Sequence, residues 1–160
     1  MIRQESRLDC TTEAAAPFIE AQREVLDRIA RRLGVQVIAT DDTSSAAVDA
    51  VIEKDGVVVA VAEVKSRRMS LEDLQRFGTY LVTAEKLDEL SRTARLLCAE
   101  GFIFVHLRVG DDVIYWRICD DLGAFAFAFE RRQTKTQRTV NGGTASRVNA
   151  FLPLAHGRLL

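Results

Sequence analysis

Residues 47–65 read AVDAVIEKDGVVVAVAEVK, and this stretch decides the fold of the chain. Two runs rich in β-branched residues flank the segment Lys-Asp-Gly at 54–56. Runs of this kind, separated by a short Asp-Gly turn, are typical of a β-hairpin. We therefore predict two antiparallel strands joined near Gly56.

Three charged side chains interrupt the apolar character of this hairpin. Asp49 lies near its open end, and Glu63 and Lys65 lie at the same end on the second strand. Because side chains alternate along a strand, Glu63 and Lys65 share one face. Acidic and lysine side chains are rarely buried unless they are paired or bound to a metal. The three residues are therefore the first candidates for a functional site.

The length of the turn decides whether Asp49 joins them. A two-residue loop pairs Lys54 with Val57 and leaves Asp49 and Glu63 on opposite faces. A three-residue loop over 54–56, with Gly56 in the left-handed conformation, makes Glu63 a same-face diagonal neighbour of Asp49, about 7–8 Å away. We predict the three-residue loop, or a bulge with the same effect, because a shared site requires it.

Composition favours one soluble domain of 160 residues with a substantial core, since 48% of the residues are hydrophobic. The net charge of −1 gives no sign of a polyanionic partner, but the charge is unevenly distributed. Residues 131–160 hold six basic and no acidic side chains, whereas residues 1–130 hold 16 basic and 23 acidic ones. This pattern predicts a main domain over 1–130 and a basic arm over 131–160, and it is a modest indication of nucleic-acid contact.

The cysteines and the N-terminal residues indicate where the protein works. Cys10, Cys98 and Cys119 form no CxxC pair, so structural disulfides and a zinc ribbon are not expected, and a reducing cytoplasm fits best. The first 20 residues contain no apolar leader, and no run has the length of a membrane span. We expect a cytoplasmic protein without a membrane partner.

A helix is predicted from about residue 12 to Leu33, ending at Gly34. Gln22 falls at the centre of its apolar stripe, where it is either a core polar residue or the helix group that reaches the hairpin. The predicted buried face of this helix comprises Phe18, Val25, Leu26, Ile29 and Leu33.

The remaining elements follow from apolar patterns and their capping residues. Residues 35–39 form a strand, and the polar loop 40–45 leads to Asp49. Asp41 and Asp42 in that loop are interpreted as turn residues. The other predicted elements are a helix from Ser70 to Gly78, a second helix over 83–100, a strand pair over 102–108 and 113–118, an outer strand over 124–130, the basic arm, and a segment 151–154 that docks back onto the body.

Lys86 lies in the first turn of the helix over 83–100, where the helix dipole favours an acid over a base. It is either a solvated lysine or a contact to a phosphate or an active site.

The order of elements predicts a mixed sheet flanked by helices, and Asp49, Glu63 and Lys65 form the pattern D-x13-E-x-K at the open end of the hairpin. This pattern resembles the PD-(D/E)XK nuclease superfamily, of the restriction-endonuclease and Holliday-junction-resolvase type. The resemblance covers roughly residues 14–118. It extends to VDAVIEKDG and AVAEVKSR in the hairpin, to the helix start TYLVTAEKL and to the strand GFIFVHL.

The resemblance implies an α/β, restriction-endonuclease-like αβββαβ core with a basic C-terminal extension. It also implies a metal-dependent DNA endonuclease in which Asp49, Glu63 and the Val64 carbonyl hold Mg²⁺, with Mn²⁺ as a substitute. Lys65 would orient or deprotonate the attacking water, and Lys86 would be an auxiliary polar residue.

The same resemblance implies contact with DNA through basic side chains, and a homodimer is possible. Arg67 and Arg68 would follow the phosphate backbone. The basic arm would add Arg131, Arg132, Lys135 and Arg138.

Two departures qualify the resemblance. The first helix carries Gln22 where many members have a glutamate that points at the metal, and Val48 replaces the proline that names the motif. A RecB-type Q-x3-Y pattern is not matched either, since Gln75 and Tyr80 are five residues apart.

Two other hypotheses come from different classes of protein. One is a catalytically inactive module that keeps the nuclease fold and binds DNA or protein. The other is an unrelated α/β protein in which Glu63 and Lys65 form an ordinary ion pair.

Overall fold

The structure is a computed structural model that describes residues 16–40, 46–135 and 146–160. Its elements in chain order are α1 (Ala16–Leu33), β1 (Gln36–Ala39), β2 (Ala50–Lys54), β3 (Val57–Arg67), α2 (Leu71–Phe77), β4 (Thr79–Thr83), α3 (Ala84–Leu97), β5 (Glu100–Leu107), β6 (Asp112–Cys119), β7 (Glu130–Lys135), β8 (Ser146–Pro153), the 3-10 turn η2 (Leu154–His156) and β9 (Arg158–Leu159).

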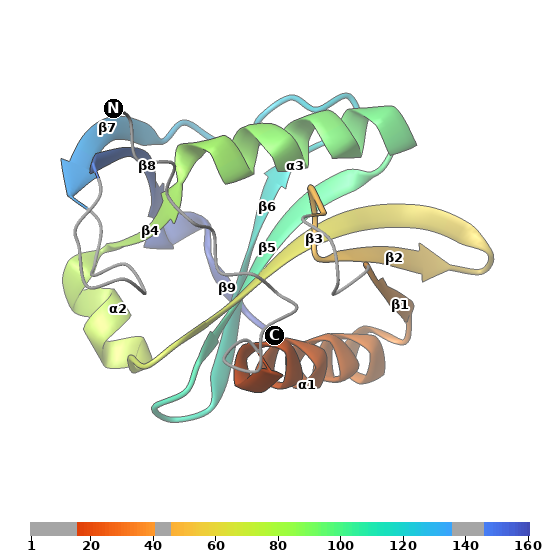
Figure 1. Ribbon diagram of the computed structural model, residues 1–160, viewed down its shortest axis with the longest axis horizontal. Helices are drawn as coiled ribbons and strands as arrows, with labels where there is room; N and C mark the ends of the chain where they lie inside the picture. The colour runs from red at the N-terminus through yellow and green to blue at the C-terminus, as the bar shows by residue number, and fades with distance from the viewer. Residues whose placement is uncertain (1–15, 41–45, 136–145) are drawn as a thin grey trace.

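The main sheet has six strands in the order β1-β2-β3-β5-β6-β9. Only β3 and β5 run parallel, because the chain between them crosses over through α2, β4 and α3. Helix α1 lies against one face of this sheet and α3 lies on the other side, as Figure 1 shows. The predicted mixed sheet flanked by helices is confirmed.

A second sheet of three strands, β4-β8-β7, lies at the left of Figure 1. Two sequence-based expectations differ from it. Residues 124–129 form no strand apart from one bridge between Phe125 and Cys119, so the predicted outer strand is wrong. Residues 131–135 are not a loose arm but part of β7, which pairs along its whole length with β8. Strand β8, which contains residues 151–153, also pairs with β4.

The outer edge of β6 explains why the alternating segment 124–130 does not become a strand there. Strand β9 pairs with Ile114 and Tyr115, and Phe125 bridges Cys119 near the other end of β6. The free length of this edge is therefore short. The phenylalanines pack all the same, because Phe127 and Phe129 contact the core and stack edge to face.

The β2–β3 hairpin turns through Asp55 and Gly56, both with positive φ, so that Lys54 pairs with Val57. The predicted three-residue loop is wrong. A bulge follows at Val59, since Glu53 pairs with Val58 but Ile52 pairs with Ala60. This bulge confirms the alternative, because it restores Asp49 to the face of Glu63.

The core is divided by the main sheet into two clusters. On the α1 side, Val25, Leu26 and Ile29 pack against Ala62 and Val64. The helix ends at Leu33 as predicted, its predicted start near residue 12 lies outside the described residues, and two of its predicted core residues are wrong. Phe18 is 64% exposed and Leu33 is 49% exposed, and α1 contributes Val25, Leu26 and Ile29 to the buried cluster.

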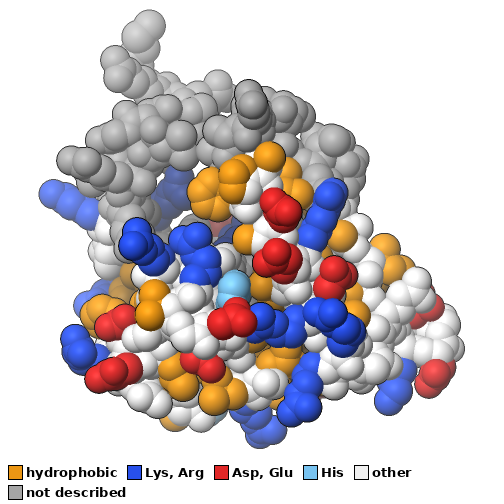
Figure 2. Space-filling view, turned by 90° about the horizontal axis from the view of Figure 1, so that it is seen from below, with side chains coloured by type: hydrophobic (Ala, Val, Ile, Leu, Met, Phe, Trp, Pro, Cys, Tyr) orange, Lys and Arg blue, Asp and Glu red, His pale blue; other side chains and the backbone are white. Residues whose placement is uncertain are grey.

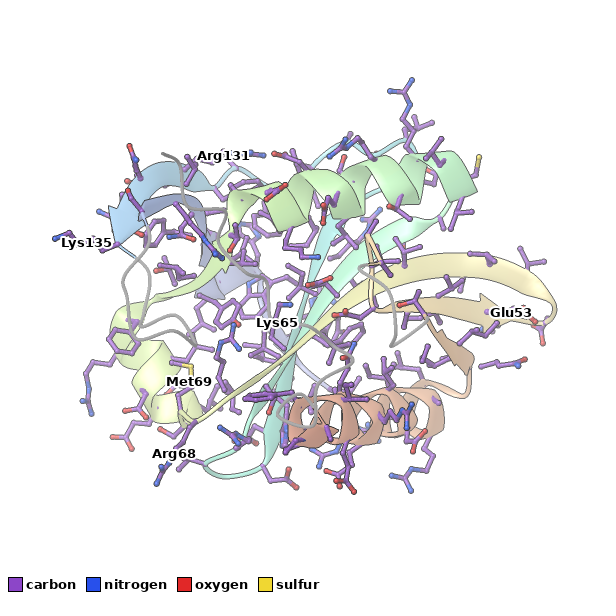
Figure 3. All side chains as sticks on the ribbon, in the orientation of Figure 1. Glu53, Lys65, Arg68, Met69, Arg131 and Lys135 are labelled. Atoms are coloured by element: carbon purple, nitrogen blue, oxygen red, sulfur yellow. The ribbon has the colours of Figure 1, made fainter. Side chains whose placement is uncertain are left out.

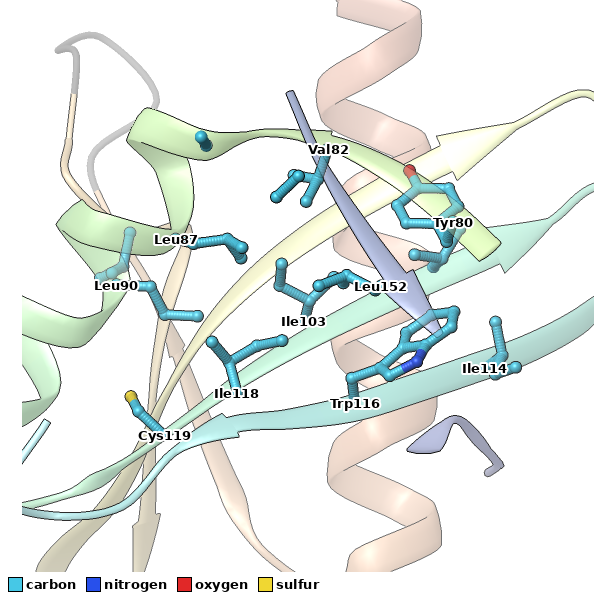
Figure 4. Packing of buried hydrophobic residues seen from close by; sticks show 14 of the residues in the cluster. Tyr80, Val82, Leu87, Leu90, Ile103, Ile114, Trp116, Ile118, Cys119 and Leu152 are labelled. Atoms are coloured by element: carbon cyan, nitrogen blue, oxygen red, sulfur yellow. The ribbon is translucent and has the colours of Figure 1, made fainter. Parts of the chain in front are cut away.

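On the opposite face, α3 and the second sheet cover a larger cluster, shown in Figure 4. Its fully buried members include Leu87, Ile103, Trp116 and Leu152. Burial of this apolar surface from four elements holds the second sheet and α3 against the main sheet.

Helices α2 and α3 occur close to where the sequence predicted them. A capping box at the N-terminus of α2 joins Ser70 and Asp73, and Gly78 ends this helix in the left-handed conformation. Helix α3 begins at Ala84, which leaves residues 79–83 for strand β4, an element the sequence analysis missed. In the described part of the chain, no helix is long and apolar enough to cross a membrane.

Candidate active site

The candidate site lies where β2 begins beside the middle of β3. The Ala50–Ala62 pair is the last of the β2–β3 ladder, and one further bond runs from the Asp49 N–H to the Ala62 carbonyl at 2.9 Å. The Asp49 backbone thus bonds to Ala62 and its carboxylate accepts from the Val64 N–H, which places Asp49 beside residues 62–64 of β3.

Glu63 is a fully buried carboxylate, with 1% of its surface exposed. Its Oε1 atom is ion-paired with the Lys65 ammonium, two residues along the same face of β3. The Lys86 Nζ atom lies 3.9 Å from the same oxygen and 3.2 Å from Glu89. The structure therefore brings Asp49, Glu63, Lys65 and Lys86 together.

Burial raises the pKa of Glu63, and the Asp49 carboxylate adds to this, while Lys65 and Lys86 oppose it. Burial alone would lower the pKa of Lys65, but the carboxylates of Glu63 and Asp49 outweigh it and raise this pKa instead. Two carboxylates that repel each other in a buried place form a site that a cation stabilises.

Backbone geometry brings a third oxygen to the same place. The Val64 N–H donates to Asp49 Oδ2 at 2.7 Å, so the backbone groups of Val64 face the open end of the hairpin beyond the last ladder pair. In a β-strand the N–H and the C=O of one residue point to the same side. The Val64 carbonyl is thus directed to the side of Asp49.

This donor set fits a hard divalent cation. Asp49, Glu63 and Val64 offer two carboxylates and a carbonyl, and Mg²⁺ is commonly bound by one or two carboxylates and several waters. No group of three or more His, Cys, Asp or Glu side chains converges in the described ranges, so two carboxylates are the side-chain ligands that this place offers.

Gln22 is not brought into this cluster. It is half-buried on α1, whose core residues pack on the opposite face of the sheet from Glu63. Within the described residues, no hydrogen bond joins Gln22 to Asp49, Glu63, Lys65 or Lys86. Its role in catalysis stays a prediction.

The predicted DNA-binding residues are spread over the molecule. Arg67 follows Lys65 on the same face of β3, whereas Arg68 lies beyond the end of β3 near α2. Figure 3 places Arg131 and Lys135 on β7, well separated from Arg68. Arg138 lies outside the described residues.

Two of the arginines on β7 are already engaged within the protein. Arg131 makes a bidentate pair with Asp88 of α3 at 2.7 and 2.9 Å, and Arg132 lies over the Phe151 ring at 4.1 Å. On the face seen in Figure 2, basic and acidic side chains are interspersed, so the described part of that face carries no patch of one sign.

Sequence reasoning missed one polar group near this site, the hydroxyl of Tyr80 on β4. Arg67, Lys65 and Glu63 all act on the pKa of this phenol, which burial raises. The sequence could not have revealed this, because the proximity depends on β4, whose residues 79–82 were interpreted as the lead-in to a helix.

No family model matches the chain, and no curated protein matches it in sequence. A search of solved structures finds similarity to Hjc, a Holliday junction resolvase from the archaeal hyperthermophile Archaeoglobus fulgidus. The match has a TM-score of 0.50 and 16% sequence identity, and it covers 83% of this chain and 88% of the other. At this identity the match shows a shared fold, in agreement with the fold class predicted from the hairpin motif.

Proposed function

We propose that this protein is a metal-dependent endonuclease that hydrolyses phosphodiester bonds of DNA. The observation that carries the proposal is the buried carboxylate of Glu63, close to Asp49 and in contact with the Lys65 ammonium. An ordinary structural ion pair needs one acid and one base. Here Asp49 and Glu63 lie with Lys65 and Lys86 where β2 begins, and Glu89 also pairs with Lys86. Carboxylates that can hold a metal, together with ammonium groups, suit the stabilisation of charge on a phosphoryl group.

Each residue has a role that its chemistry supports. Asp49, Glu63 and the Val64 carbonyl would hold Mg²⁺, or Mn²⁺ in its place. The bound ion would supply charge neutralisation at the scissile phosphate and a more acidic water. Lys65 orients the attacking water and pairs with the phosphoryl oxygens, since an ammonium group has three donors and Glu63 occupies one of them. Lys86, at the start of α3, would add positive charge beside Glu63 as an auxiliary polar residue.

Gln22 and the basic residues would complete the substrate site. Arg67 and Arg68 would contact the phosphate backbone, and Arg131, Arg132, Lys135 and Arg138 would extend the contact. Gln22 would take part through its amide oxygen. A homodimer would allow two strands to be cut by one assembly.

The test is cleavage of plasmid DNA and of four-way-junction DNA with Mg²⁺ or Mn²⁺. The wild type is compared with Lys65→Ala and Asp49→Asn, and both variants are expected to lose at least about 100-fold in rate. Lys54→Ala and Asp55→Asn are matched controls, because these residues are exposed at the far tip of the same hairpin. The controls should cut like the wild type.

The alternative of an inactive nuclease-fold module has one observation in its favour. Asp49 and Glu63 already accept bonds from Val64 and Lys65, so a metal has to displace or share them. Absence of cleavage on every DNA substrate, together with no Mg²⁺ or Mn²⁺ binding by calorimetry, would replace the nuclease proposal with this alternative.

A further inference from the structure

The Tyr80 hydroxyl is a buried polar group without a hydrogen-bond partner among the described residues. Tyr80 itself is 4% exposed. A buried hydroxyl that forms no bond is unfavourable, and native structures rarely contain one without a reason. A phenylalanine would fill the same space without this penalty. The oxygen therefore calls for an explanation that packing does not provide.

The ring of Tyr80 is held in a fixed position. It stacks on Trp116 with 5.6 Å between ring centroids, and the Trp116 Nε1–H donates to the Pro153 carbonyl at 3.0 Å. Tyr80 also pairs with Leu152 in the β4–β8 ladder. Figure 4 shows the ring between these elements with its oxygen pointing away from the tryptophan. The hydroxyl is thus a rigidly placed group, with little conformational entropy left to lose.

Three charged side chains are close enough to influence this hydroxyl. Burial raises the pKa of Tyr80. Arg67 opposes the rise by its charge and by a side-chain contact with the hydroxyl, and this contact falls short of the geometry of a full hydrogen bond. Lys65 is already paired with Glu63. The Arg67 guanidinium is exposed at the end of β3 and donates to the Ser66 carbonyl at 3.0 Å through Nη1. With five N–H donors in all, Arg67 can serve a further acceptor.

We propose that Tyr80 is a positioning residue for Arg67: its hydroxyl oxygen accepts a hydrogen bond from the guanidinium when Arg67 binds a backbone phosphate next to the scissile one. This inference rests on the proposed nuclease function and extends it to the binding of the DNA backbone. The hydroxyl has almost no exposed surface, so Tyr80 does not touch the DNA itself. Bonds of this kind are often long in the unbound protein and shorten only in the complex.

In this proposal Arg67 binds the phosphate and Tyr80 orients the guanidinium of Arg67. A phosphate is recognised by two parallel N–H bonds from one guanidinium, which needs the plane of that group to be fixed. The bond from Arg67 to the Ser66 carbonyl leaves the plane of its exposed guanidinium free to turn. An immobile acceptor beside it supplies the missing orientation and lowers the entropy lost on binding.

The experiment is a double-mutant cycle on DNA binding. Wild type, Tyr80→Phe, Arg67→Gln and the double variant are titrated against fluorescent duplex and four-way-junction DNA without divalent metal. Tyr80→Phe and Arg67→Gln are each expected to weaken binding by on the order of tenfold, the effect of one hydrogen bond to a charged group. The double variant should bind no more weakly than Arg67→Gln, because Tyr80 acts through Arg67. In cleavage assays, Tyr80→Phe should raise KM and leave kcat unchanged.

Tyr115→Phe is the matched control, since Tyr115 stacks on Phe104 on the other face of the main sheet. Its binding should equal that of the wild type. Thermal unfolding of Tyr80→Phe separates a packing effect from a binding effect, and its Tm should not fall. Additive effects of Tyr80→Phe and Arg67→Gln, or Tyr80→Phe binding as tightly as Tyr115→Phe, would overturn this inference alone. A wild type that neither binds nor cuts any DNA would remove the proposed function as well.

Discussion

At the scale of single residues, the two described cysteines differ sharply in environment. Cys119 is completely buried in the core, whereas Cys98 is exposed at the end of α3. Burial raises the pKa of the Cys119 thiol to about 11. The thiolate is the reactive form, and at pH 8 only about a thousandth of the Cys119 thiol would be ionised.

We predict that alkylation by iodoacetamide at pH 8 modifies Cys98 and leaves Cys119 unmodified. The experiment uses a Cys10→Ser background and mass spectrometry of the peptides. A rise in pH toward 11 should speed labelling of Cys119 only as its thiolate forms, and urea should expose it at any pH. Equal labelling rates for the two thiols in the folded protein at pH 8 would contradict the buried position of Cys119.

Some residues of the candidate site could be predicted from the sequence, and others could not. Glu63 and Lys65 were assigned to one face correctly, because strand periodicity depends on their spacing alone. Lys86 was a candidate from its place in the first turn of a helix. Tyr80 was missed because its neighbours come from β3, which is distant in sequence, and only the packing of β4 brings them together.

At the scale of elements, β5 and β6 approach each other at a glycine. A Cβ atom at Gly101 would lie 2.5 Å from the Cys119 sulfur and 3.2 Å from Leu90, in a fully buried place. We predict that Gly101→Ala lowers the free energy of unfolding by about 1–3 kcal/mol, the usual cost of overpacking a core. Urea unfolding measures the change.

The steric overlap created by Gly101→Ala involves few atoms, so removing one of them should relieve it. Cys119→Ala removes the nearest atom, and Gly101→Ala combined with Cys119→Ala should be more stable than the sum of the two single effects predicts. Gly56→Ala is a useful comparison. Nothing lies within 4 Å of its added Cβ, so its cost comes from the positive φ of 79° and not from packing.

The available strand edges explain why the strand predicted from the alternating residues 124–130 is wrong. Alternation states which side of a strand is apolar but not whether a partner edge is available. Here β9 and the Phe125 bridge take up most of the outer edge of β6. The next strand therefore begins at Glu130 and pairs with β8. The position of the bulge at Val59 could not be predicted either, because the turn sequence alone permits either register of β2 against β3.

At the scale of the whole molecule, the β7–β8 hairpin is attached to the main body in two ways. Strand β8 pairs with β4, and Arg131 of β7 is bound to Asp88 of α3 and lies over the Phe129 ring at 5.2 Å. The two guanidinium bonds hold the pKa of Asp88 below its usual range. Since the folded state then binds the Asp88 proton less readily, this pair stabilises the fold above the ordinary Asp pKa and loses its effect as pH falls through the lowered value.

We predict that Asp88→Asn lowers the free energy of unfolding by about 0.5 kcal/mol at pH 7, because both side chains are partly exposed and screened by solvent. The difference from the wild type should shrink as the pH falls below about 4 and vanish once Asp88 is protonated in both states. Asp121→Asn, an exposed aspartate in the loop after β6, is the matched control and should be as stable as the wild type at pH 7. Urea unfolding at several pH values, followed by tryptophan fluorescence and by circular dichroism, measures both variants.

The two probes should give coincident transitions, because a hairpin that shares the core of Trp116 and Leu152 must unfold with the main sheet. Separate transitions, or a loss at pH 7 that persists unchanged at pH 3, would mean that residues 130–153 behave as an independent arm and that the Arg131–Asp88 pair does not fix them to α3.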